Sequence, residues 1–321
     1  MKHVSILIPR GNTSVVNIGG THQIFSMVNP VLQQMRRNPV FDIHLVGVER
    51  TTEKSPGIFS VKPDCMMSDV EKTDLIIIPA IFDEISTAKK QNQEFIPWIL
   101  HHYKNGAEVA SLCVAAFFLA ETGLLDGKQC STHWMHANNF RKLYPDVVLV
   151  DDKIMTEEDG IYTSGGAYAF LNLLLYLIEK NAGRDVAVHI SKAFNIDIDK
   201  DSQSPFIIFE GQKDHDDKVV KKAQETIEKN YGEKLTVNDL VESLAISRRS
   251  LERRFKKATS NTLVEYIQRV KVEVAKRSFE TTRKNVNEIM YDVGYSDTKS
   301  FRTVFRKVTG LTPFEYRKKY H

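Results

Sequence analysis

Cys113 and His133 are the residues of this 321-residue chain whose types and spacing could do covalent chemistry. Cys113 ends the apolar run AEVASLC and directly precedes the helix-like run VAAFFLAETGLL, with small Ser111 and Ala115 two positions to either side. A tight turn from strand to helix needs such small neighbours, and the N-terminus of a helix lowers the pKa of a thiol. His133 follows twenty positions later. The pair raises the hypothesis of a cysteine nucleophile served by a histidine base.

The elements around Cys113 alternate between apolar strand-like runs and helical stretches. Continuous apolar runs of this kind predict a parallel sheet that helices cover on both faces, so we expect an open, flavodoxin-like α/β sandwich. Ligands in such folds bind at the carboxyl ends of the strands, where Cys113 lies. The expected strands are VSILIP (4–9), FDIHLVGV (41–48), DLIIIPA (74–80), AEVASLC (107–113) and GIYTSG (160–165), and the expected helices include THQIFSMVNPVLQQMRR (21–37), QNQEFIPWILHHYKN (91–105) and AYAFLNLLLYLIEKNA (167–182).

Other residues that could bind a metal or form disulfides make weaker patterns. His133 and His136 lie three positions apart, but no carboxylate or thiol follows at a matching spacing, so we predict no metal site. Cys65, Cys113 and Cys130 are a sparse, odd set that provides no disulfide framework. The N-terminal run VSILIP is typical of a buried strand rather than a signal peptide, and no apolar run reaches the ~18 residues of a membrane helix. We expect a cytoplasmic chain with reduced thiols, no cofactor and no membrane partner.

Charge divides the chain into an acidic and a basic part. Residues 218–321 hold 24 Lys and Arg against 13 Asp and Glu, a net charge of +11, which leaves −8 for residues 1–217. A basic part of this size indicates contact with nucleic acid, and a solvated lysine-rich surface is the alternative. The change falls in a polar stretch that contains Pro205 and Gly211. We predict an α/β domain over residues 1–195, a linker over 196–217 and an all-α domain over 218–321.

The basic part repeats itself at an offset of 49 or 50 residues. Each copy is typical of a short amphipathic helix, a turn, and a second helix that begins at a capping Ser247 or Asp297. This is the layout of a helix-turn-helix. Between the copies, residues 263–282 have apolar positions at helical spacing and predict one long connecting helix. The repeated segments are VNDL (237–240) and VNEI (286–289), SLERRF (250–255) and SFRTVF (300–305), and TSNTLVEY (259–266) and TGLTPFEY (309–316).

The second helix of each copy has an apolar side and a polar side. Leu251 with Phe255, and Phe301 with Phe305, are spaced to pack on the first helix. The opposite side suits a DNA major groove, where Arg and Lys bind guanine acceptors, Glu accepts from cytosine and Thr contacts the thymine methyl. A fixed connector would place the two helices about one turn, ~34 Å, apart on one side of the duplex. The polar side displays Arg249, Glu252, Arg253 and Lys256 in the first copy and Thr298, Lys299, Arg302 and Arg306 in the second.

Residues 218–321 resemble the DNA-binding domain of AraC-family transcription regulators. The stretch GYSDTKSFRTVFRKVTGLTPFEYR carries the family's signature, and the resemblance covers nearly all of this part. Ser260 and Leu263 stand where the family commonly has Gly and Pro, so helix starts there are expected to differ slightly. The resemblance implies double-stranded DNA as the partner, with base contacts from Arg249, Glu252 and Arg253 in the first reading helix and from Thr298, Lys299, Ser300, Arg302 and Thr303 in the second.

The acidic part resembles the PfpI-like branch of the class I glutamine amidotransferase superfamily, and more closely its members fused to AraC-type domains. The segments ASLCVAAFFLAETGLLDGKQCSTHW and DGIYTSGGAYAFLNLLLYLIEKNAGRDVA carry the likeness, by which Cys113 and His133 occupy the positions that catalytic relatives use. Three departures stand against catalysis. Ala80 and Ile81 replace the glycine pair that supplies oxyanion donors, the loop GNTSVVNIGG (11–20) lacks the relatives' Glu, and Val114 replaces a His. We therefore predict that the chain is not an enzyme.

These inferences combine into one hypothesis, a sequence-specific DNA-binding transcription regulator whose α/β domain binds a small effector or forms a homodimer. Cys113, His133, Ala80 and Gly165 are the candidate residues of its ligand pocket. Cys113 has three interpretations: a nucleophile, a thiol that contacts a ligand or responds to oxidants, and a small buried residue suited to the turn. Gly165 and the adjacent Gly166 either line the pocket or allow close packing.

Two other functions stay open at this point. One is a cysteine-dependent hydrolase or glyoxalase-like enzyme centred on Cys113, and the other is an architectural protein that coats DNA without regard to sequence. Discrimination between cognate and random DNA at fixed salt separates the second from a regulator. The sequence leaves open the effector, the operator, the oligomeric state, the redox response of Cys113 and the choice between activation and repression.

Overall fold

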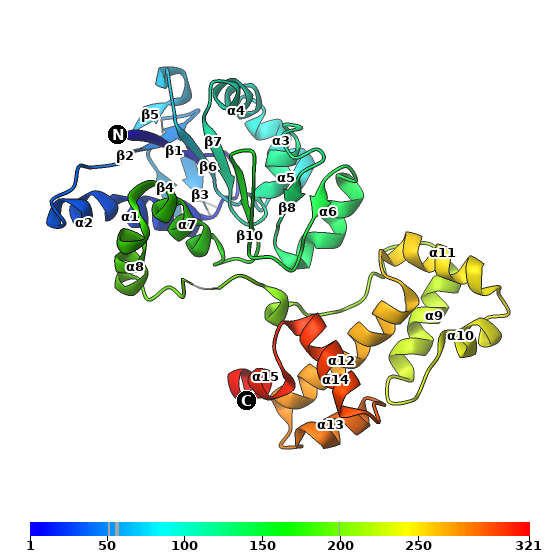
Figure 1. Ribbon diagram of the computed structural model, residues 1–321. Helices are drawn as coiled ribbons and strands as arrows, with labels where there is room; N and C mark the ends of the chain where they lie inside the picture. The colour runs from blue at the N-terminus through cyan, green and yellow to red at the C-terminus, as the bar shows by residue number, and fades with distance from the viewer. Residues whose placement is uncertain (51, 55–57, 199) are drawn as a thin grey trace. The chain divides into compact units, whose positions relative to one another are not determined.

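The computed structural model of the chain describes residues 1–50, 52–54, 58–198 and 200–321 (Figure 1). Residues 51 and 55–57, in the predicted α/β domain, and residue 199, in the predicted linker, lie outside the described residues. The chain forms two compact units, Met1–Gln203 and Ser204–His321. The point of division therefore falls inside the stretch that the sequence predicts as a linker.

A seven-stranded sheet forms the centre of the first unit, in the order β10-β11-β7-β6-β1-β2-β5. Its neighbouring strands are parallel, except that β10 and β11 form an antiparallel hairpin at one edge. Asp159 and Gly160, both at positive φ, make the tight turn of this hairpin, as is usual for an Asp-Gly pair. The strands are β1 (Lys2–Ile8), β2 (Phe41–Gly47), β5 (Cys65–Met66), β6 (Leu75–Ile78), β7 (Glu108–Ser111), β10 (Met155–Glu158) and β11 (Ile161–Ser164).

The five strands expected from apolar runs are present as β1, β2, β6, β7 and β11. The edge strands β5 and β10 were not expected, because β5 has two residues and β10 has the polar sequence MTEE. Two small sheets lie outside the main one. They are β3 (Thr52–Lys54) with β4 (Phe59–Val61), and β8 (Gln129–Cys130) with β9 (Val148–Leu149).

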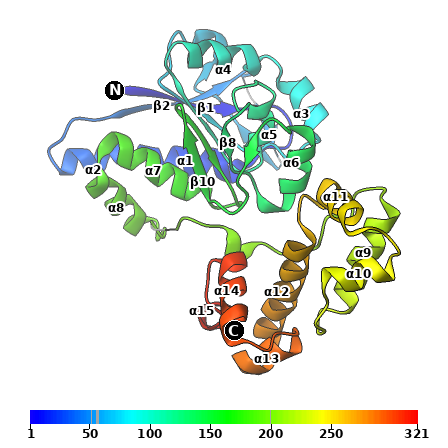
Figure 2. The ribbon, with the colours of Figure 1, turned by 45° about the vertical axis from the view of Figure 1, so that its right-hand side comes forward.

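Helices cover both faces of the sheet, as the α/β sandwich requires (Figures 1 and 2). Alternate residues of β1 serve the two cores, because Ile6 packs in one and Leu7 in the other. On the first face lie α1 (Val15–Ser26), α2 (Val28–Gln34), α7 (Phe170–Ala182) and α8 (Arg184–Ala193). On the second lie α3 (Ile85–Asn92), α4 (Phe95–Lys104), α5 (Ala115–Ala120) and α6 (Ala137–Leu143).

Helix α1 begins six residues before the expected start of the helix 21–37. Ser14 caps it, since its side chain accepts a hydrogen bond from the backbone N–H of Asn17. Gly19 and Gly20 lie inside the helix, and glycine there has a low helix propensity, which hides the first turns from a reading of the sequence. Gly20 has a packing role, because a Cβ there would lie 3.3 Å from the ring of Phe170 on α7.

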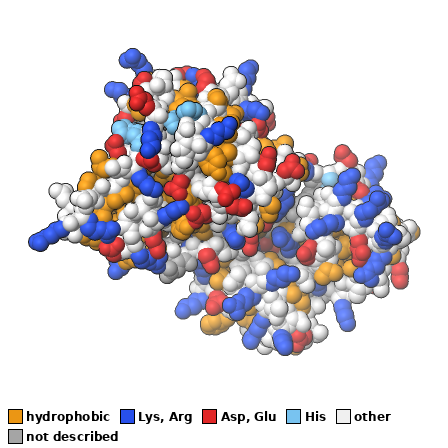
Figure 3. Space-filling view, turned by 45° about the horizontal axis from the view of Figure 1, so that its top comes forward, with side chains coloured by type: hydrophobic (Ala, Val, Ile, Leu, Met, Phe, Trp, Pro, Cys, Tyr) orange, Lys and Arg blue, Asp and Glu red, His pale blue; other side chains and the backbone are white. Residues whose placement is uncertain are grey.

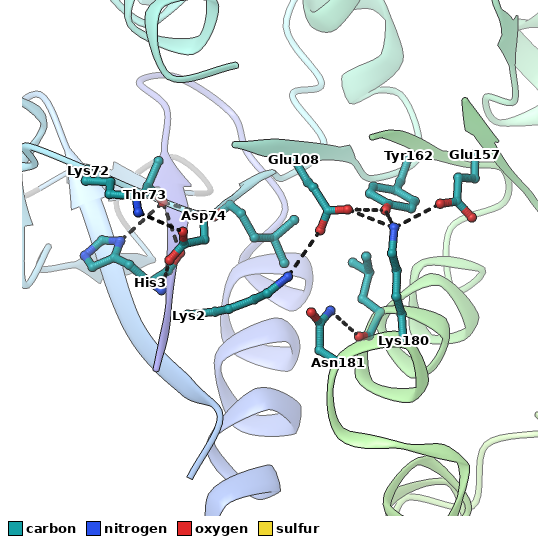
Figure 4. A network of polar contacts seen from close by, with 12 residues as sticks. Lys2, His3, Lys72, Thr73, Asp74, Glu108, Glu157, Tyr162, Lys180 and Asn181 are labelled. Carbon is teal, nitrogen blue, oxygen red and sulfur yellow. Dashed lines mark hydrogen bonds and ion pairs between the residues drawn. The ribbon is translucent and has the colours of Figure 1, made fainter. Parts of the chain in front are cut away.

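A polar network at the amino end of β7 joins the edge hairpin to α7 (Figure 4). The ammonium of Lys180 donates to Glu108 Oε1 at 2.8 Å, to Glu157 Oε1 at 3.1 Å and to the hydroxyl of Tyr162. Burial opposes protonation of Lys180, but these acceptors raise its pKa above the ordinary value. The network therefore stabilises the end of the sheet away from Cys113, which follows the carboxyl end of β7.

The second unit consists of helices arranged around two small cores. Helix α12 is shared, with Tyr266 and Val270 in the first core and Ala275 and Phe279 in the second. Its bounds agree with the predicted connecting helix 263–282. The helices are α9 (Lys218–Lys229), α10 (Val237–Ser243), α11 (Arg248–Thr259), α12 (Leu263–Thr281), α13 (Val286–Asp292), α14 (Thr298–Thr309) and α15 (Pro313–Tyr320). No helix of the described residues is both long and apolar enough to cross a membrane.

Buried Lys271, on α12, ties the two cores together. Its ammonium donates to the carbonyl oxygens of Glu233, before α10, and Val293, after α13, at 2.9 and 2.8 Å. Burial lowers the pKa of Lys271, and the two carbonyls satisfy its buried charge. The adjacent turn is correspondingly tight, because a Cβ on Gly294 would lie 2.6 Å from the carbonyl oxygen of Gly232. The two helix-turn-helix copies are thus held to one connector.

The predicted linker, residues 196–217, is divided between the units. Asn172 on α7 donates to the carbonyl of Asp197 at 2.5 Å, so the start of the stretch packs on the α/β unit. Lys276 on α12 donates to the carbonyl of Ile207 at 2.5 Å, and the N–H of Phe209 donates to Glu273 at 3.1 Å. The end of the stretch therefore packs on the helical unit, where Pro205 is buried. Backbone groups of Asp197, Ile207 and Phe209 in the predicted linker are therefore hydrogen-bonded within the two units.

Candidate functional site

Cys113 occupies the turn between β7 and α5 in a left-handed conformation, at φ 57°. The strand-to-helix elbow predicted from its small neighbours is therefore present. Two side chains hold its backbone: the N–H of Cys113 donates to Ser164 Oγ at 3.1 Å, and the hydroxyl of Thr132 donates to the carbonyl of Cys113 at 3.2 Å. Ser164 ends β11 and Thr132 follows β8, so the elbow is fixed by two neighbouring strand ends.

The thiol of Cys113 is not activated. The residue is 3% exposed, and burial raises the pKa of the thiol to about 11, although the N–H of Val114 opposes the shift. Helix α5 has six residues, and its N-terminus does not outweigh the loss of water around the sulfur. The expectation that the helix lowers the pKa of this thiol is wrong, because desolvation dominates.

His133 is not arranged as a base for Cys113. Its Nδ1 accepts a hydrogen bond from the N–H of Met135 at 3.2 Å, so the neutral ring carries its proton on Nε2. Burial, followed by the neighbouring His136, lowers the pKa of His133 and keeps the ring neutral at pH 7. Among the described residues, no hydrogen bond joins this ring to the Cys113 thiol. Cys113 and His133 therefore stay a neutral thiol and a neutral imidazole, and they do not form the thiolate–imidazolium pair of a cysteine nucleophile.

The region of Ala80 offers no free oxyanion donor at that residue. The N–H of Ala80 donates to the buried Oδ1 of Asn17 at 3.1 Å, and its carbonyl accepts from the N–H of Ser14 at 2.9 Å. Thr13 and Ile81 also form a backbone bridge, which pairs the loops after β1 and β6. The glycine pair and the acid of catalytic relatives are missing, and the two loops that would hold them are hydrogen-bonded to each other. This geometry therefore gives the hydrolase alternative no support.

The histidines of HWMH do not build a metal centre. The ring centroids of His133 and His136 lie 5.9 Å apart. Within residues 1–50, 52–54, 58–198 and 200–321, no three His, Cys, Asp or Glu side chains gather as a metal ion requires.

A cavity of about 680 Å³ lies beside the elbow, between α3, α5 and α6. Val114, directly after Cys113, and Ile81, directly after Ala80, are in its wall. Of the four residues predicted for the ligand pocket, Cys113, His133, Ala80 and Gly165, none lines it. The cavity is large enough for a small organic molecule.

The wall of this cavity combines aromatic surface with acidic groups. Phe82, Phe117, Phe118 and Tyr144 supply aromatic surface. Its charged lining residues are three carboxylates, from Asp83, Glu84 and Glu121, and one ammonium, from Lys89, so the net charge of the lining is −2.

Among the carboxylates of the cavity, Glu121 has both a hydrogen bond and an ion pair with other lining residues. Tyr144 donates to it at 2.7 Å and Lys89 forms an ion pair with it. Burial opposes its ionisation, but these two donors lower the pKa of Glu121 below the ordinary value. Burial lowers the pKa of His136, so this ring in the wall is neutral at pH 7. The cavity therefore stays acidic at neutral pH.

The two helix-turn-helix motifs are α10 with α11 and α13 with α14. Their second helices begin as predicted, because Ser247 and Asp297 cap them by accepting from the backbone N–H groups of Ser250 and Ser300. The predicted apolar side is buried, since Leu251, Phe255, Phe301 and Phe305 are each 0% exposed. The opposite side of each helix therefore faces solvent.

The residues predicted to contact DNA lie on this outer side. All are exposed except Thr298, which is half-buried at the start of α14. Glu252 forms an ion pair with Arg248 at 2.9 Å, and Lys256 donates to the carbonyl of Ser260 at 2.8 Å. On the face drawn in Figure 3, Lys and Arg side chains protrude from the helical unit at many points. The exposed set is Arg249, Glu252, Arg253, Lys256, Lys299, Ser300, Arg302, Thr303 and Arg306.

Sequence reasoning missed Asn17, Ser164 and Gln203, which hold the loops around Cys113. Asn17 lies three positions after the capping Ser14, in a loop whose lack of acidic residues was its informative feature. Ser164 precedes the glycine pair Gly165-Gly166, and that pair was the available signal. Gln203 lies in the predicted linker and gives no signal in the sequence.

Comparisons with known proteins agree with this arrangement. A family described as "Helix-turn-helix domain" matches residues 240–319, and one described as "DJ-1/PfpI family" matches residues 28–180. The chain is 26% identical over 215 residues to the HTH-type transcriptional regulator ArgR of Pseudomonas aeruginosa, which covers 67% of this chain and 65% of that protein. It is 22% identical over 318 residues to the HTH-type transcriptional regulator GbdR of the same species, over 95% of this chain and 82% of that protein.

A solved structure shares the fold of the α/β unit. A putative transcriptional regulator from Vibrio parahaemolyticus matches 60% of this chain and 98% of its own, with a TM-score of 0.53 and 22% identity. The likeness concerns the fold. ArgR and GbdR are both named as transcriptional regulators, which agrees with the prediction made from the missing catalytic groups.

Proposed function

Because this chain is a transcription regulator that joins a DJ-1/PfpI domain to an AraC-type helix-turn-helix domain, we propose that α11 and α14 enter successive major-groove segments of one operator. One observation carries this proposal: each helix buries one side in its own core and exposes the other, and both cores share α12. The proposed base and phosphate contacts come from Arg249, Glu252, Arg253, Lys256, Thr298, Lys299, Ser300, Arg302, Thr303 and Arg306.

The test uses genomic fragments that the full-length chain retains on purification. Arg253→Ala and Arg302→Ala each remove a guanidinium from a reading helix, so each weakens binding by about 1–3 kcal/mol, or roughly five- to 150-fold. Lys222→Ala is the matched control, because it removes an exposed charge from α9, outside the reading helices. Titrations at one salt concentration measure the effect. Equal affinity for random DNA would support sequence-blind coating instead.

We propose that the cavity beside the elbow takes the effector, a small molecule with an apolar body and a cationic group. The aromatic wall suits the apolar body, and the net charge of −2 on the lining residues attracts a cation. Val114 places the cavity next to the elbow, so a ligand there would contact the residue that follows Cys113.

Thermal unfolding with two probes of equal size checks this assignment. Phenethylamine carries an ammonium on a phenyl ring and phenylacetate a carboxylate, so the amine is expected to raise Tm more at equal concentration. Asn139→Trp places a bulky ring in the cavity wall and removes the effect, whereas Asn138→Trp, exposed on the same helix outside that wall, retains it. A larger stabilisation by the anion would contradict the proposed ligand class.

We also propose that the chain acts as a homodimer in the cytoplasm, where a bacterial-type regulator meets its DNA. Two readers in one complex gain affinity through effective concentration. Sedimentation of the full-length chain across a concentration range checks the assembly. A species that stays monomeric when it is bound to DNA argues against it.

A further inference from the structure

Gln203, the last residue of the α/β unit, is buried at the back of the elbow. It is 2% exposed although the sequence places it in a polar stretch. Its Nε2 donates to the carbonyl oxygens of Thr132 and Lys153 at 3.0 and 3.2 Å, and its Oε1 accepts from the N–H of Gly166 at 3.0 Å. The amide of this side chain is therefore fully engaged by backbone groups.

These bonds form part of a ring that includes Cys113. From Gln203 the ring runs to Thr132, whose hydroxyl donates to the carbonyl of Cys113. The N–H of Cys113 donates to Ser164, and the backbone leads from Ser164 to Gly166. The N–H of Gly166 then donates to Gln203 and closes the ring. If one residue of this ring moves, the others have to move with it to keep their hydrogen bonds. Water does not easily replace these bonds, because each is buried or half-buried.

Gly165 shows how closely Gln203 fits. A Cβ at Gly165 would lie 2.4 Å from Nε2 of Gln203, so no larger residue fits there while Gln203 stays in place. Of the two interpretations of this glycine, the geometry favours close packing, and Gln203 is the packing partner. The backbone is also held, since the N–H of Gln203 donates to the carbonyl of Asp152 at 2.9 Å.

The chain leaves this ring directly for the helical unit. Ser204, the next residue, belongs to that unit and begins a short helical turn, Ser204–Phe206. Lys276 and Glu273, both on α12, then hold Ile207 and Phe209. The peptide bond after Gln203 thus joins a residue that is hydrogen-bonded at the elbow to a segment whose backbone is hydrogen-bonded to the connector of the two reading motifs.

We propose that Gln203 is the positioning residue through which the conformation of the Cys113 elbow reaches the DNA-binding unit. This rests on the proposed function, in which the cavity beside Val114 takes an effector. A ligand that favours one conformation of the elbow shifts Thr132 and Gly166, and with them Gln203 and the start of the segment docked on α12.

Amide hydrogen exchange in the full-length chain tests the coupling. Thr132→Val removes the bond to Cys113, and Gly165→Ala displaces Gln203. Each is expected to speed exchange in residues 204–210 by about tenfold, the cost of roughly one buried hydrogen bond. Thr21→Val is the matched control, because this buried hydroxyl in α1 has no hydrogen-bond partner among the described residues, and exchange in 204–210 stays unchanged. Faster exchange confined to residues near each substitution, with 204–210 unaltered, overturns the proposal.

Gln203→Leu separates this inference from the proposed function. It keeps the volume of the side chain, removes three hydrogen bonds, and is expected to reproduce the exchange pattern of Gly165→Ala. DNA binding by the unsubstituted chain is measured in parallel on its recovered genomic fragment and on random DNA. If that chain discriminates while the variants leave residues 204–210 unchanged, the role of Gln203 fails alone. If it does not discriminate, the proposed function fails, and the exchange data still decide whether elbow and junction are coupled.

Discussion

At the scale of single residues, Cys113 combines a turn suited to catalysis with an environment that prevents it. A non-glycine residue in the left-handed region costs about 1–2 kcal/mol. Ser164 and Thr132 offset that cost by bonding the N–H and C=O of the same residue. Since the thiol itself is buried and protonated, the elbow fixes backbone geometry, and its chemistry as a nucleophile is lost.

The pKa of about 11 predicts slow labelling of Cys113 in the native chain. At pH 8 about one thiol in a thousand is then ionised, and the thiolate is the reactive form. Cys65 is partly exposed and serves as the internal comparison. Titration with a chromogenic disulfide reagent, followed by mass mapping, is expected to find Cys65 labelled first, and Cys65→Ala removes that fast phase. Rapid labelling of Cys113 below pH 8 would show that burial does not control it.

Ser260 supplies a second prediction about the left-handed region. It ends α11 at φ 58°, at the position that Gly310 occupies after α14 at φ 74°. Ser260→Gly is expected to raise the free energy of unfolding by about 0.5–1 kcal/mol, because glycine adopts this conformation without strain. Gly310→Ser, the reciprocal change, lowers it by a similar amount. Urea unfolding measures both changes. A lower free energy of unfolding in Ser260→Gly would contradict the claim that Ser260 is strained.

At the scale of elements, the two copies of the helix-turn-helix share their boundaries. Helix α12 begins at Leu263 and α15 at Pro313, an offset of 50, so the replacement of the family's proline does not move the helix start. Thr262 and Thr312 cap these helices in the same way, each with a glutamate three positions on. The expectation that the missing Gly and Pro shift the helix starts is wrong here, because capping specifies the boundary.

Helices α9 and α11 are joined by Asp217 and Arg254, and this pair predicts a pH dependence. Arg254 donates to both carboxylate oxygens of Asp217, at 2.8 and 2.6 Å, which lowers the pKa of Asp217 to about 2. A carboxyl whose pKa is lower in the folded state stabilises that state above its ordinary pKa near 3.8, and the contribution is lost as pH falls from about 4 to about 2.

Arg254→Met is expected to lower the free energy of unfolding at pH 7 and to flatten its slope between pH 4 and 2, because it removes the guanidinium that lowers the pKa of Asp217. Part of the slope persists, because the N–H groups of Val219 and Val220 also bond Asp217. Arg253→Met, its exposed neighbour, leaves the slope intact. Denaturant unfolding at several pH values measures the difference, and equal slopes in the two variants would exclude a role for the pair.

At the scale of the whole molecule, the basic charge lies in the part that carries the helix-turn-helix motifs, and the acidic charge lies in the rest of the chain. Residues 218–321 carry a net charge of +11 and residues 1–217 carry −8. The basic part neutralises phosphates and releases counterions when it binds DNA, whereas the acidic part does not favour contact with the duplex. Contact with DNA is thereby directed to the helical unit.

This division predicts a strong dependence of DNA affinity on salt. Between 50 and 200 mM salt, the binding constant for the recovered fragment is expected to fall by at least about tenfold, linearly on a double logarithmic plot. Lys299→Ala removes one exposed charge from α14 and lowers the slope by about 0.9 if that ammonium contacts a phosphate. A binding constant that is insensitive to salt would show that phosphate contacts are minor.

The sequence by itself determined what depends on local pattern. Apolar runs specified five strands of the sheet, and the repeat, the caps Ser247 and Asp297 and the apolar pairs specified both helix-turn-helix motifs. These features rest on periodicity and on bonds within a few residues, so they can be read along the chain. The missing catalytic partners of Cys113 were also visible, because they are absences at expected positions.

Only the tertiary structure decided what depends on distant segments and on burial. The raised pKa of Cys113 arises from desolvation, and sequence reasoning expected the opposite shift. The cavity beside Val114 is formed by three helices, and Gln203 reaches Thr132 across 71 positions of sequence. Hydrogen bonds and desolvation of this kind depend on which atoms meet after folding, so they cannot be read from the order of residues along the chain.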